Sequence, residues 1–170
     1  MALLLIANGP MQTTAAFAAV ATGTNIKTML HVKPSATLVA QIVEWGCSFD
    51  GSAAATPGIV ELIETDVAAT VTASVAADIT KLDGAALTCG DVTTNLIQVG
   101  TAATGYTATV EGSTTAVRNL DGPQLIAPTN QFIKQFPLGN EPIIQVAKFM
   151  RIRVTFGTAV NAYCYVILRI

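Results

Sequence analysis

The stretch QIVEWGCSF, residues 41–49, alternates large apolar side chains with smaller or more polar ones. Four side chains fall on one face of an extended strand, because successive side chains of a strand point to opposite sides: Val43, Trp45, Cys47 and Phe49. Asp50-Gly51 follows directly and is a strong turn signal. The stretch therefore predicts a half-buried β-strand that ends at residue 49 and turns Trp45 and Cys47 toward a core.

The same alternation closes the chain. In residues 149–156 apolar side chains take one face, while Arg151 and Arg153 take the other. A short turn at 157–159 leads into 161–170, which is rich in apolar residues. We predict a closing hairpin whose last strand is central or well paired, because an apolar strand at an open edge invites aggregation.

Further strands are predicted at 59–64 and 69–75, and weaker ones at 15–21, 26–32, 106–110, 114–118, 131–136 and 143–146. Alanine is frequent but is mixed with Thr, Val and Gly rather than spaced as in a helix. So many short strands separated by turn signals predict an all-β, two-sheet antiparallel β-sandwich. Turn signals repeatedly interrupt residues Ala76 to Gly105, which predicts a long loop inserted in the sandwich.

The composition points to one domain that has partners. Of 170 residues, 51% are hydrophobic and only 12% are charged, against about a quarter in an ordinary soluble domain. We assign residues 15–170 to a single β-sandwich domain. Residues 1–14 carry almost no charge and contain Pro10, and we predict an N-terminal arm that orders on a partner. The alternative is an edge strand of the chain's own subunit. A chain with so few charged residues would expose a nearly uncharged surface as a monomer, and partner subunits are one way to cover such a surface. The composition therefore favours a subunit of an assembly.

Charge and cysteine usage exclude several classes of protein. A net charge of −2 offers no basic field for nucleic acid. The apolar run Leu3 to Ala7 is too short for a signal peptide, and no run approaches a membrane span. We therefore expect synthesis in the cytoplasm without export and no membrane partner. Three cysteines, Cys47, Cys89 and Cys164, lack C-x-x-C spacing and are predicted to be free, mostly buried thiols.

Candidates for catalysis are few. His31 is the sole histidine, and no nucleophile motif accompanies it, so we predict a satisfied histidine at a strand end. Glu44 and Glu61 are predicted on the outer faces of neighbouring strands, where a glycosidase presents its two carboxylates. The alternative pairs them with Arg151 and Arg153 across strands. We expect no enzymatic activity.

Metal and cofactor sites are not indicated. Glu61, Glu64 and Asp66 lack the spacing of a calcium loop, and strand alternation sends the first two to opposite faces. No phosphate-binding glycine motif is present in the sequence. Most basic residues lie in the C-terminal third, and we predict solvated or cross-strand-paired charges, with contact to an acidic protein surface as the alternative. They are Arg118, Lys134, Lys148, Arg151, Arg153 and Arg169.

Four phrases of the sequence resemble a known group of proteins. They are EWGCSFDGSAAA (44–55), VELIETDVAATVT (60–72), APTNQFIKQFPLGNEP (127–142) and the closing RIRVT (151–155) with the Ala-Val-Asn turn and last strand that follow. They look like small virion structural proteins of tailed bacteriophages, especially those infecting actinobacteria. The similarity covers most of residues 23–170.

The resemblance implies a jelly-roll-like β-sandwich that serves as a capsid decoration or minor head protein. It implies a homotrimer that binds the major capsid protein on the outer surface of the phage head, with no cofactor and no catalytic or metal-ligating residue. The alternative is a receptor- or carbohydrate-binding jelly roll of the tail or fibres. That alternative needs exposed aromatic side chains, for which Tyr106, Tyr163 and Tyr165 are the candidates.

Overall fold

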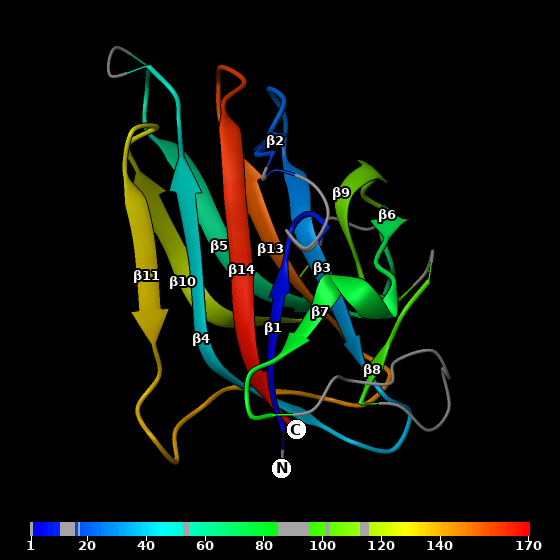
Figure 1. Cartoon of the computed structure of the whole chain (residues 1–170). Helices are drawn as coiled ribbons and strands as arrows, with labels where there is room; N and C mark the ends of the chain where they lie inside the picture. The colour runs from blue at the N-terminus through cyan, green and yellow to red at the C-terminus, as the bar shows by residue number, and fades with distance from the viewer. Residues whose placement is uncertain are drawn as a thin grey trace.

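Two antiparallel β-sheets pack face to face in the computed structural model, which describes residues 2–10, 16, 18–52, 55–84, 96–100, 103–112 and 116–170 (Figure 1). The all-β sandwich is thereby confirmed, while its jelly-roll connectivity stays a prediction. The helical structure of the described residues is one 3-10 turn, η1 (Ala76–Asp78). In this part of the chain no helix is long and apolar enough to cross a membrane.

Sheet A carries the final strand at its centre. Its order is β11 (Gln131–Gln135), β4 (Ala40–Phe49), β14 (Asn161–Arg169), β1 (Leu3–Ala7) and β7 (Ile79–Lys81), with β12 (Ile143–Ile144) beside β4 and β2 (Val20–Ala21) beside β14. The prediction of a closing hairpin is wrong, because β14 lies in sheet A and the preceding strand, β13 (Phe149–Thr155), lies in sheet B. The prediction that the last strand is well paired is confirmed.

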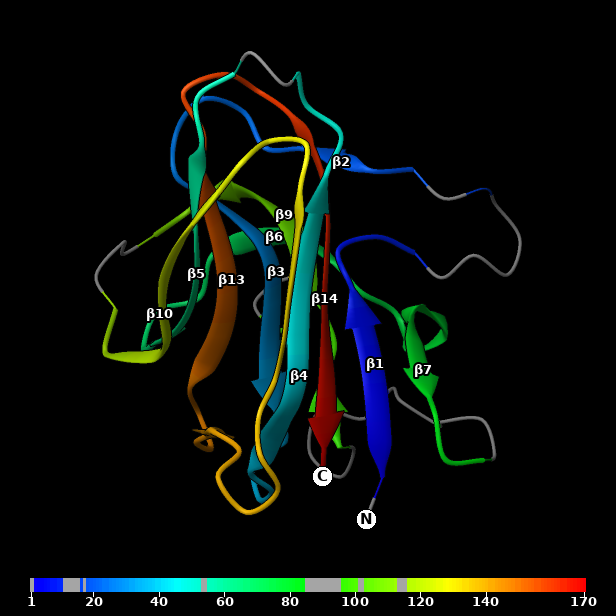
Figure 2. The same ribbon diagram turned by 90° about the vertical axis from the view of Figure 1, so that its left-hand side faces the viewer.

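Sheet B forms the second layer. Its order is β10 (Arg118–Ile126), β5 (Gly58–Thr65), β13 (Phe149–Thr155), β3 (Lys27–Pro34), β9 (Gly105–Val110) and β6 (Thr70–Ala73), with β8 (Ile97–Gln98) beside β3. The two layers are seen from the side in Figure 2, with β5 and β13 in one and β14 and β1 in the other. Long apolar strands from both sheets enclose the core between them.

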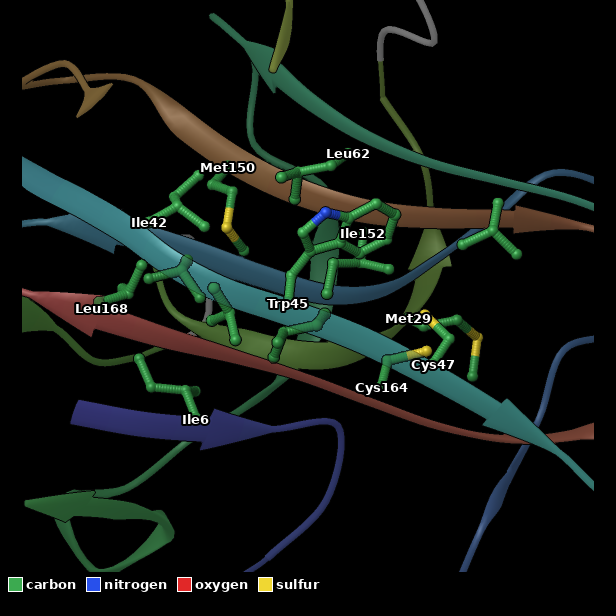
Figure 3. Close-up of a cluster of buried hydrophobic side chains, with 14 of the residues drawn as sticks. Ile6, Met29, Ile42, Trp45, Cys47, Leu62, Met150, Ile152, Cys164 and Leu168 are labelled. Atoms are coloured by element: carbon green, nitrogen blue, oxygen red, sulfur yellow. The ribbon is translucent and has the colours of Figure 1, made fainter. Parts of the chain in front are cut away.

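The core is built from the inward side chains of both sheets (Figure 3). Trp45 is fully buried there, and its indole N–H donates to Asp121 Oδ2 at 3.1 Å. Lys134 donates to the other oxygen of Asp121 at 2.6 Å. Since Trp45 and Lys134 belong to sheet A and Asp121 to sheet B, this network ties the sheets together where β10 and β11 form their edges.

A bulge changes which residues of β4 face inward. Trp45, Cys47 and Phe49 are buried as predicted, but Val43 is only half-buried and Ile42 is fully buried in its place. The register with β14 steps from Glu44 to Ile42 while the partner strand advances by one residue. Val43 is the extra residue of the bulge, and it reverses which side chains of β4 face inward toward the start of the strand. The period-two pattern of a single strand does not reveal such a reversal.

The predicted N-terminal arm over 1–14 is wrong for the described residues 2–10. β1 pairs with β14 over five residues on one side and with β7 on the other, so it is not an edge strand either. Leu4 and Ile6 are fully buried. Residues 11–14 lie outside the described residues. The predicted boundary between an arm and the domain at residue 15 therefore has no structural support, because residues 3–7 form a strand of sheet A.

Two further segments differ from the prediction. The inserted loop, Ala76 to Gly105, contributes η1, β7 and β8 to the sandwich, although 85–95 and 101–102 lie outside the described residues. Of the strand expected at 114–118, residues 114 and 115 lie outside the described residues, and β10 begins at Arg118 and runs through Gly122-Pro123 to Ile126. The register against β5 shifts between Asp121 and Gln124, which absorbs this glycine-proline pair, and a second shift lies just before it, between Asn119 and Asp121.

Candidate interaction surface

The outer face of sheet A, called face A below, is the strongest candidate for a functional surface, and Figure 1 looks onto it. Strand register brings together side chains that are far apart in the chain. Ile133 on β11 and Tyr165 on β14 both lie opposite Gly46 on β4. In the same way, Gln135 on β11 and Ile167 on β14 both lie opposite Glu44 on β4, and Leu5 on β1 lies opposite Ile167.

Two tyrosines stand at the middle of face A. The rings of Tyr163 and Tyr165 stack with centroids 5.8 Å apart and planes at 27°. Tyr165 lies over Gly46, where a Cβ would come within 2.7 Å of its ring, so glycine makes room for the aromatic side chain. Its hydroxyl donates to Glu44 Oε1 at 2.6 Å. Burial, followed by this carboxylate, raises the pKa of Tyr165, which keeps the phenol neutral and fixed.

Face A holds very little charge. Among the described residues whose side chains point outward from its strands, Glu44 and Arg169 are the charged ones. Glu44 accepts the Tyr165 hydroxyl, and Arg169 donates to Glu141 Oε1 at 2.7 Å. The charge of Arg169 is thus compensated within the subunit, whereas Glu44 is held by a neutral phenol and keeps its charge. Such a surface can be covered by a protein partner with little electrostatic desolvation, as at the charge-depleted centre of an interface.

The sequence of β14 carries a signal for this surface that period-two analysis misses. Both of its faces are apolar: inward residues such as Val166 are buried, and the outward Tyr163, Tyr165 and Ile167 are half-buried. β1, with the sequence LLLIA, has the same character. Strands that are apolar on both sides are typical of sheets covered on both sides. Sheet B covers the inner side of sheet A, and no strand or helix of the described residues covers its outer side.

The predicted carboxylate pair does not form. Glu44 lies in sheet A and Glu61 in sheet B, so the prediction of neighbouring strands is wrong. The chain crosses from one sheet to the other between β4 and β5, whereas the prediction placed the two strands side by side. Glu61 instead pairs with Arg153, which donates from Nε at 2.9 Å and from Nη2 at 2.7 Å. The arginine alternative is confirmed for Glu61 and wrong for Glu44.

His31 is buried inside β3 rather than placed at its end, and it is not satisfied. Neither ring nitrogen has a hydrogen-bond partner, and the ring packs on Phe149 with centroids 4.8 Å apart. Burial, then the positive charges of Arg151 and Lys33, lower the pKa of His31 to about 3. The imidazole is therefore neutral at physiological pH. No nucleophile or carboxylate within the described chain engages it.

The outer face of sheet B differs from face A because chain connections held by Arg151 cover its middle. The fully buried guanidinium of Arg151 donates from Nη1 to the Glu111 carbonyl at 2.8 Å and from Nη2 to the Val67 carbonyl. Nη1 also lies 3.6 Å from the Glu111 carboxylate. The connections that carry Val67 and Glu111 thus fold over the middle of sheet B and are fastened there by the arginine.

The remaining charged candidates are paired. Glu64 accepts from Arg118 at 2.9 Å, and Asp66 pairs with Lys148. No group of three or more His, Cys, Asp or Glu side chains in the described ranges could hold a metal ion. Each basic residue singled out in the C-terminal third has a carboxylate partner, which confirms the prediction of paired charges. The pairs are Arg118–Glu64, Lys134–Asp121, Lys148–Asp66, Arg151–Glu111, Arg153–Glu61 and Arg169–Glu141.

A small open pocket of about 220 Å³ lies between residues 22–27 and the end of β9. Its two charged side chains, Lys27 and Glu111, are already engaged. Glu111 accepts from the Thr28 backbone N–H at 2.6 Å and from its hydroxyl at 2.5 Å, and Lys27 donates to the Ala21 carbonyl at 2.9 Å. Pockets for small molecules are usually larger, roughly 300–1,000 Å³. Face A therefore remains the better candidate.

Of the three tyrosines considered for ligand binding, the structure brings two together. Tyr106 lies on β9 in sheet B, opposite Leu30, and so belongs to the other sheet from the pair on β14. Comparison with protein families, with curated proteins and with solved structures finds no match for the chain.

Proposed function

We propose that the chain is a non-enzymatic virion structural protein that decorates and cements the outer surface of a phage head as an oligomer. The observation that carries the proposal is face A, a nearly uncharged sheet surface whose central strands are apolar on both sides. The sandwich fold agrees with the phage structural proteins that the sequence phrases resemble. Glu61 is paired with Arg153 and lies in the other sheet from Glu44, which also supports a role in assembly over one in catalysis.

Such a protein would act through multivalent contact. One oligomer that touches several capsid subunits gains avidity without any single large interface. The described strands of face A present only two charged side chains, of which Arg169 is paired with Glu141, so apolar burial would dominate the contact. Salt should then weaken attachment little, because screening acts on exposed charge pairs rather than on apolar contacts.

The isolated protein is expected to be a homotrimer at micromolar concentration, and light scattering measures this directly. Ile167→Glu places a charge at the centre of face A, where burial in an interface would leave it unpaired. We expect association to weaken by roughly 100-fold, because burying an unpaired polar or charged group costs about 2–3 kcal/mol or more. Ile59→Glu, at an exposed position of sheet B, is the matched control and should leave the trimer intact. A monomeric wild-type protein, or an unaffected Ile167→Glu trimer, would contradict face A as the contact surface.

A second candidate function, carbohydrate binding at the tail or fibres, is favoured by the stacked pair Tyr163–Tyr165 beside Glu44 and the exposed Gln131. Sugar rings pack on aromatic faces while neighbouring polar groups accept and donate hydrogen bonds. On a glycan array Tyr163→Ala should then abolish any signal, and Tyr106→Ala should not. Absence of a signal from the wild-type protein removes this candidate and leaves the decoration role.

A further inference from the structure

Cys47 and Cys164 lie directly opposite each other on β4 and β14, the two longest strands of sheet A. Both are buried in the core with reduced thiols. Figure 3 shows the two side chains next to each other on the inner side of the sheet. The placement predicted from alternation is confirmed for this pair, whereas Cys89 lies outside the described residues.

The backbone shows which kind of pair they form. The Cys164 N–H donates to Asn8 Oδ1 at 3.0 Å, and the Cys164 carbonyl accepts from the Asn8 N–H at 2.9 Å. The N–H and C=O of one strand residue point to the same side, so both groups of Cys164 point toward the Asn8 side of β14. On the β4 side, Cys47 and Cys164 are therefore a non-hydrogen-bonded pair. In such pairs the Cα atoms are about 4.5 Å apart and the side chains approach most closely.

The two side chains lie next to each other in Figure 3. Burial, followed by the neighbouring Cys164 thiol, raises the pKa of Cys47 well above its usual range. A disulfide needs Cα atoms roughly 4.4–6.8 Å apart, and the spacing typical of a non-hydrogen-bonded pair, about 4.5 Å, falls within that range. We propose that Cys47 and Cys164 are a disulfide site, and that its oxidation joins β4 covalently to the final strand β14. The inference rests on register and burial alone and is independent of the proposed function.

The oxidant is a small-molecule disulfide such as oxidised glutathione. One cysteine thiolate attacks a sulfur of the reagent, which forms a mixed disulfide and releases one small thiol. The second cysteine thiolate then attacks the protein sulfur of that mixed disulfide, closes the Cys47–Cys164 bond and releases the second small thiol. Two electrons pass from the protein sulfurs to the reagent, and the two thiol protons end on the released thiols.

Because both thiols are buried, oxidation should be slow in the folded protein and fast during refolding. A buried thiol with a raised pKa is a poor nucleophile, so the folded protein should react slowly and only through opening of the sheet. During refolding both thiols are accessible before the core closes. The bond should then form quickly and remain protected by the same core.

The test uses the full chain with Cys89→Ser, which removes every alternative partner for the two cysteines. The protein is refolded from urea with oxidised glutathione, and free thiols are counted by alkylation and mass spectrometry. We expect an intramolecular disulfide, with a mass lower by two hydrogen atoms and no alkylated cysteine. Thermal unfolding should shift upward by roughly 10 °C, because the bond closes a loop of more than a hundred residues in the unfolded chain. Dithiothreitol should reverse the shift.

Adding Cys47→Ala to the Cys89→Ser chain gives the control, which should carry at most a glutathione adduct and show no upward shift. Two free thiols or two glutathione adducts after refolding of Cys89→Ser would overturn the inference, as would a cross-linked product that has lost its β-sheet circular dichroism. Rapid labelling of both thiols in the native protein would contradict the burial on which the argument depends.

Discussion

Lowering the pH from 7 to 4 is expected to reduce the free energy of unfolding by about 3 kcal/mol through His31 alone. In the folded protein the pKa of this histidine is lowered to about 3 by burial, then by the charges of Arg151 and Lys33. In the unfolded chain it returns to its ordinary value near 6.5. Between these two values the unfolded state binds a proton that the folded state excludes. Stability is therefore full above about pH 6.5 and falls as the pH drops toward 3.

The groups around His31 all oppose its protonation. Arg151 lies opposite it on β13, and Lys33 follows on its own strand, while the Glu111 carboxylate is directed at Arg151 rather than at the imidazole. Phe149 covers the ring on its remaining side without offering a hydrogen bond. A proton on this ring would be a buried charge beside two cations.

Urea unfolding at several pH values, for the wild type and for His31→Leu, isolates this contribution. The leucine variant removes two unpartnered nitrogens, so it should be near neutral at pH 7 and less sensitive to acid. Other groups titrate equally in both proteins. One is Glu141, whose pKa is lowered by the backbone N–H groups of Glu141 and Gly139 and by the side chain of Arg169. The difference between the two profiles should reach about 3 kcal/mol at pH 4. Parallel profiles would contradict the neutral, buried state of His31.

Replacing Trp45 by alanine should reduce the free energy of unfolding by about 3–5 kcal/mol, the range for a large aromatic residue removed from a core. The indole is fully buried between the sheets and packs on Phe132 with ring centroids 5.0 Å apart. Its loss leaves a cavity between the layers and also removes one hydrogen bond from Asp121. Ile133→Ala, at an exposed position on the neighbouring strand β11, is the control and should change stability by less than about 0.5 kcal/mol.

Trp45→Phe separates packing from hydrogen bonding. The phenyl ring retains most of the apolar volume but cannot donate to Asp121, which keeps Lys134 at 2.6 Å. We expect a loss of about 1–3 kcal/mol, smaller than that of the alanine variant. Denaturation in urea measures both variants on the same scale. Equal stability of the alanine variant and the wild type would show that Trp45 does not join the two sheets.

The sequence allowed the interior strands to be predicted well, because each carries a local alternation of side chains. Residues 41–49 and 161–170 match β4 and β14 within about one residue at each end. Strand β10 was missed because Gly122-Pro123 is locally a break, and only pairing with β5 overrides it. The inward turn of Ile42 was missed because a bulge depends on the partner strand. Such errors arise wherever a non-local contact outweighs local propensity.

The candidate surface was less predictable than the fold. The pairing of β1 with β14 joins residues at opposite ends of the chain, and neither strand indicates the other locally. The same limitation separated Glu44 from Glu61, since sheet membership is decided by long-range pairing. The apolar outer residues Tyr163, Tyr165 and Ile167 were visible in the sequence. Their meaning depends on the strands beside them, which only the structure supplies.

The copy number of the chain in purified virions tests the proposed role most directly. Quantitative mass spectrometry against the major capsid protein measures it, and cryo-electron microscopy of the same particles gives its position. A head decoration protein should be present in hundreds of copies on the outer surface of the capsid, with face A covered by a neighbouring subunit or by the capsid. A handful of copies at the tail, or absence from the particle, would contradict the account.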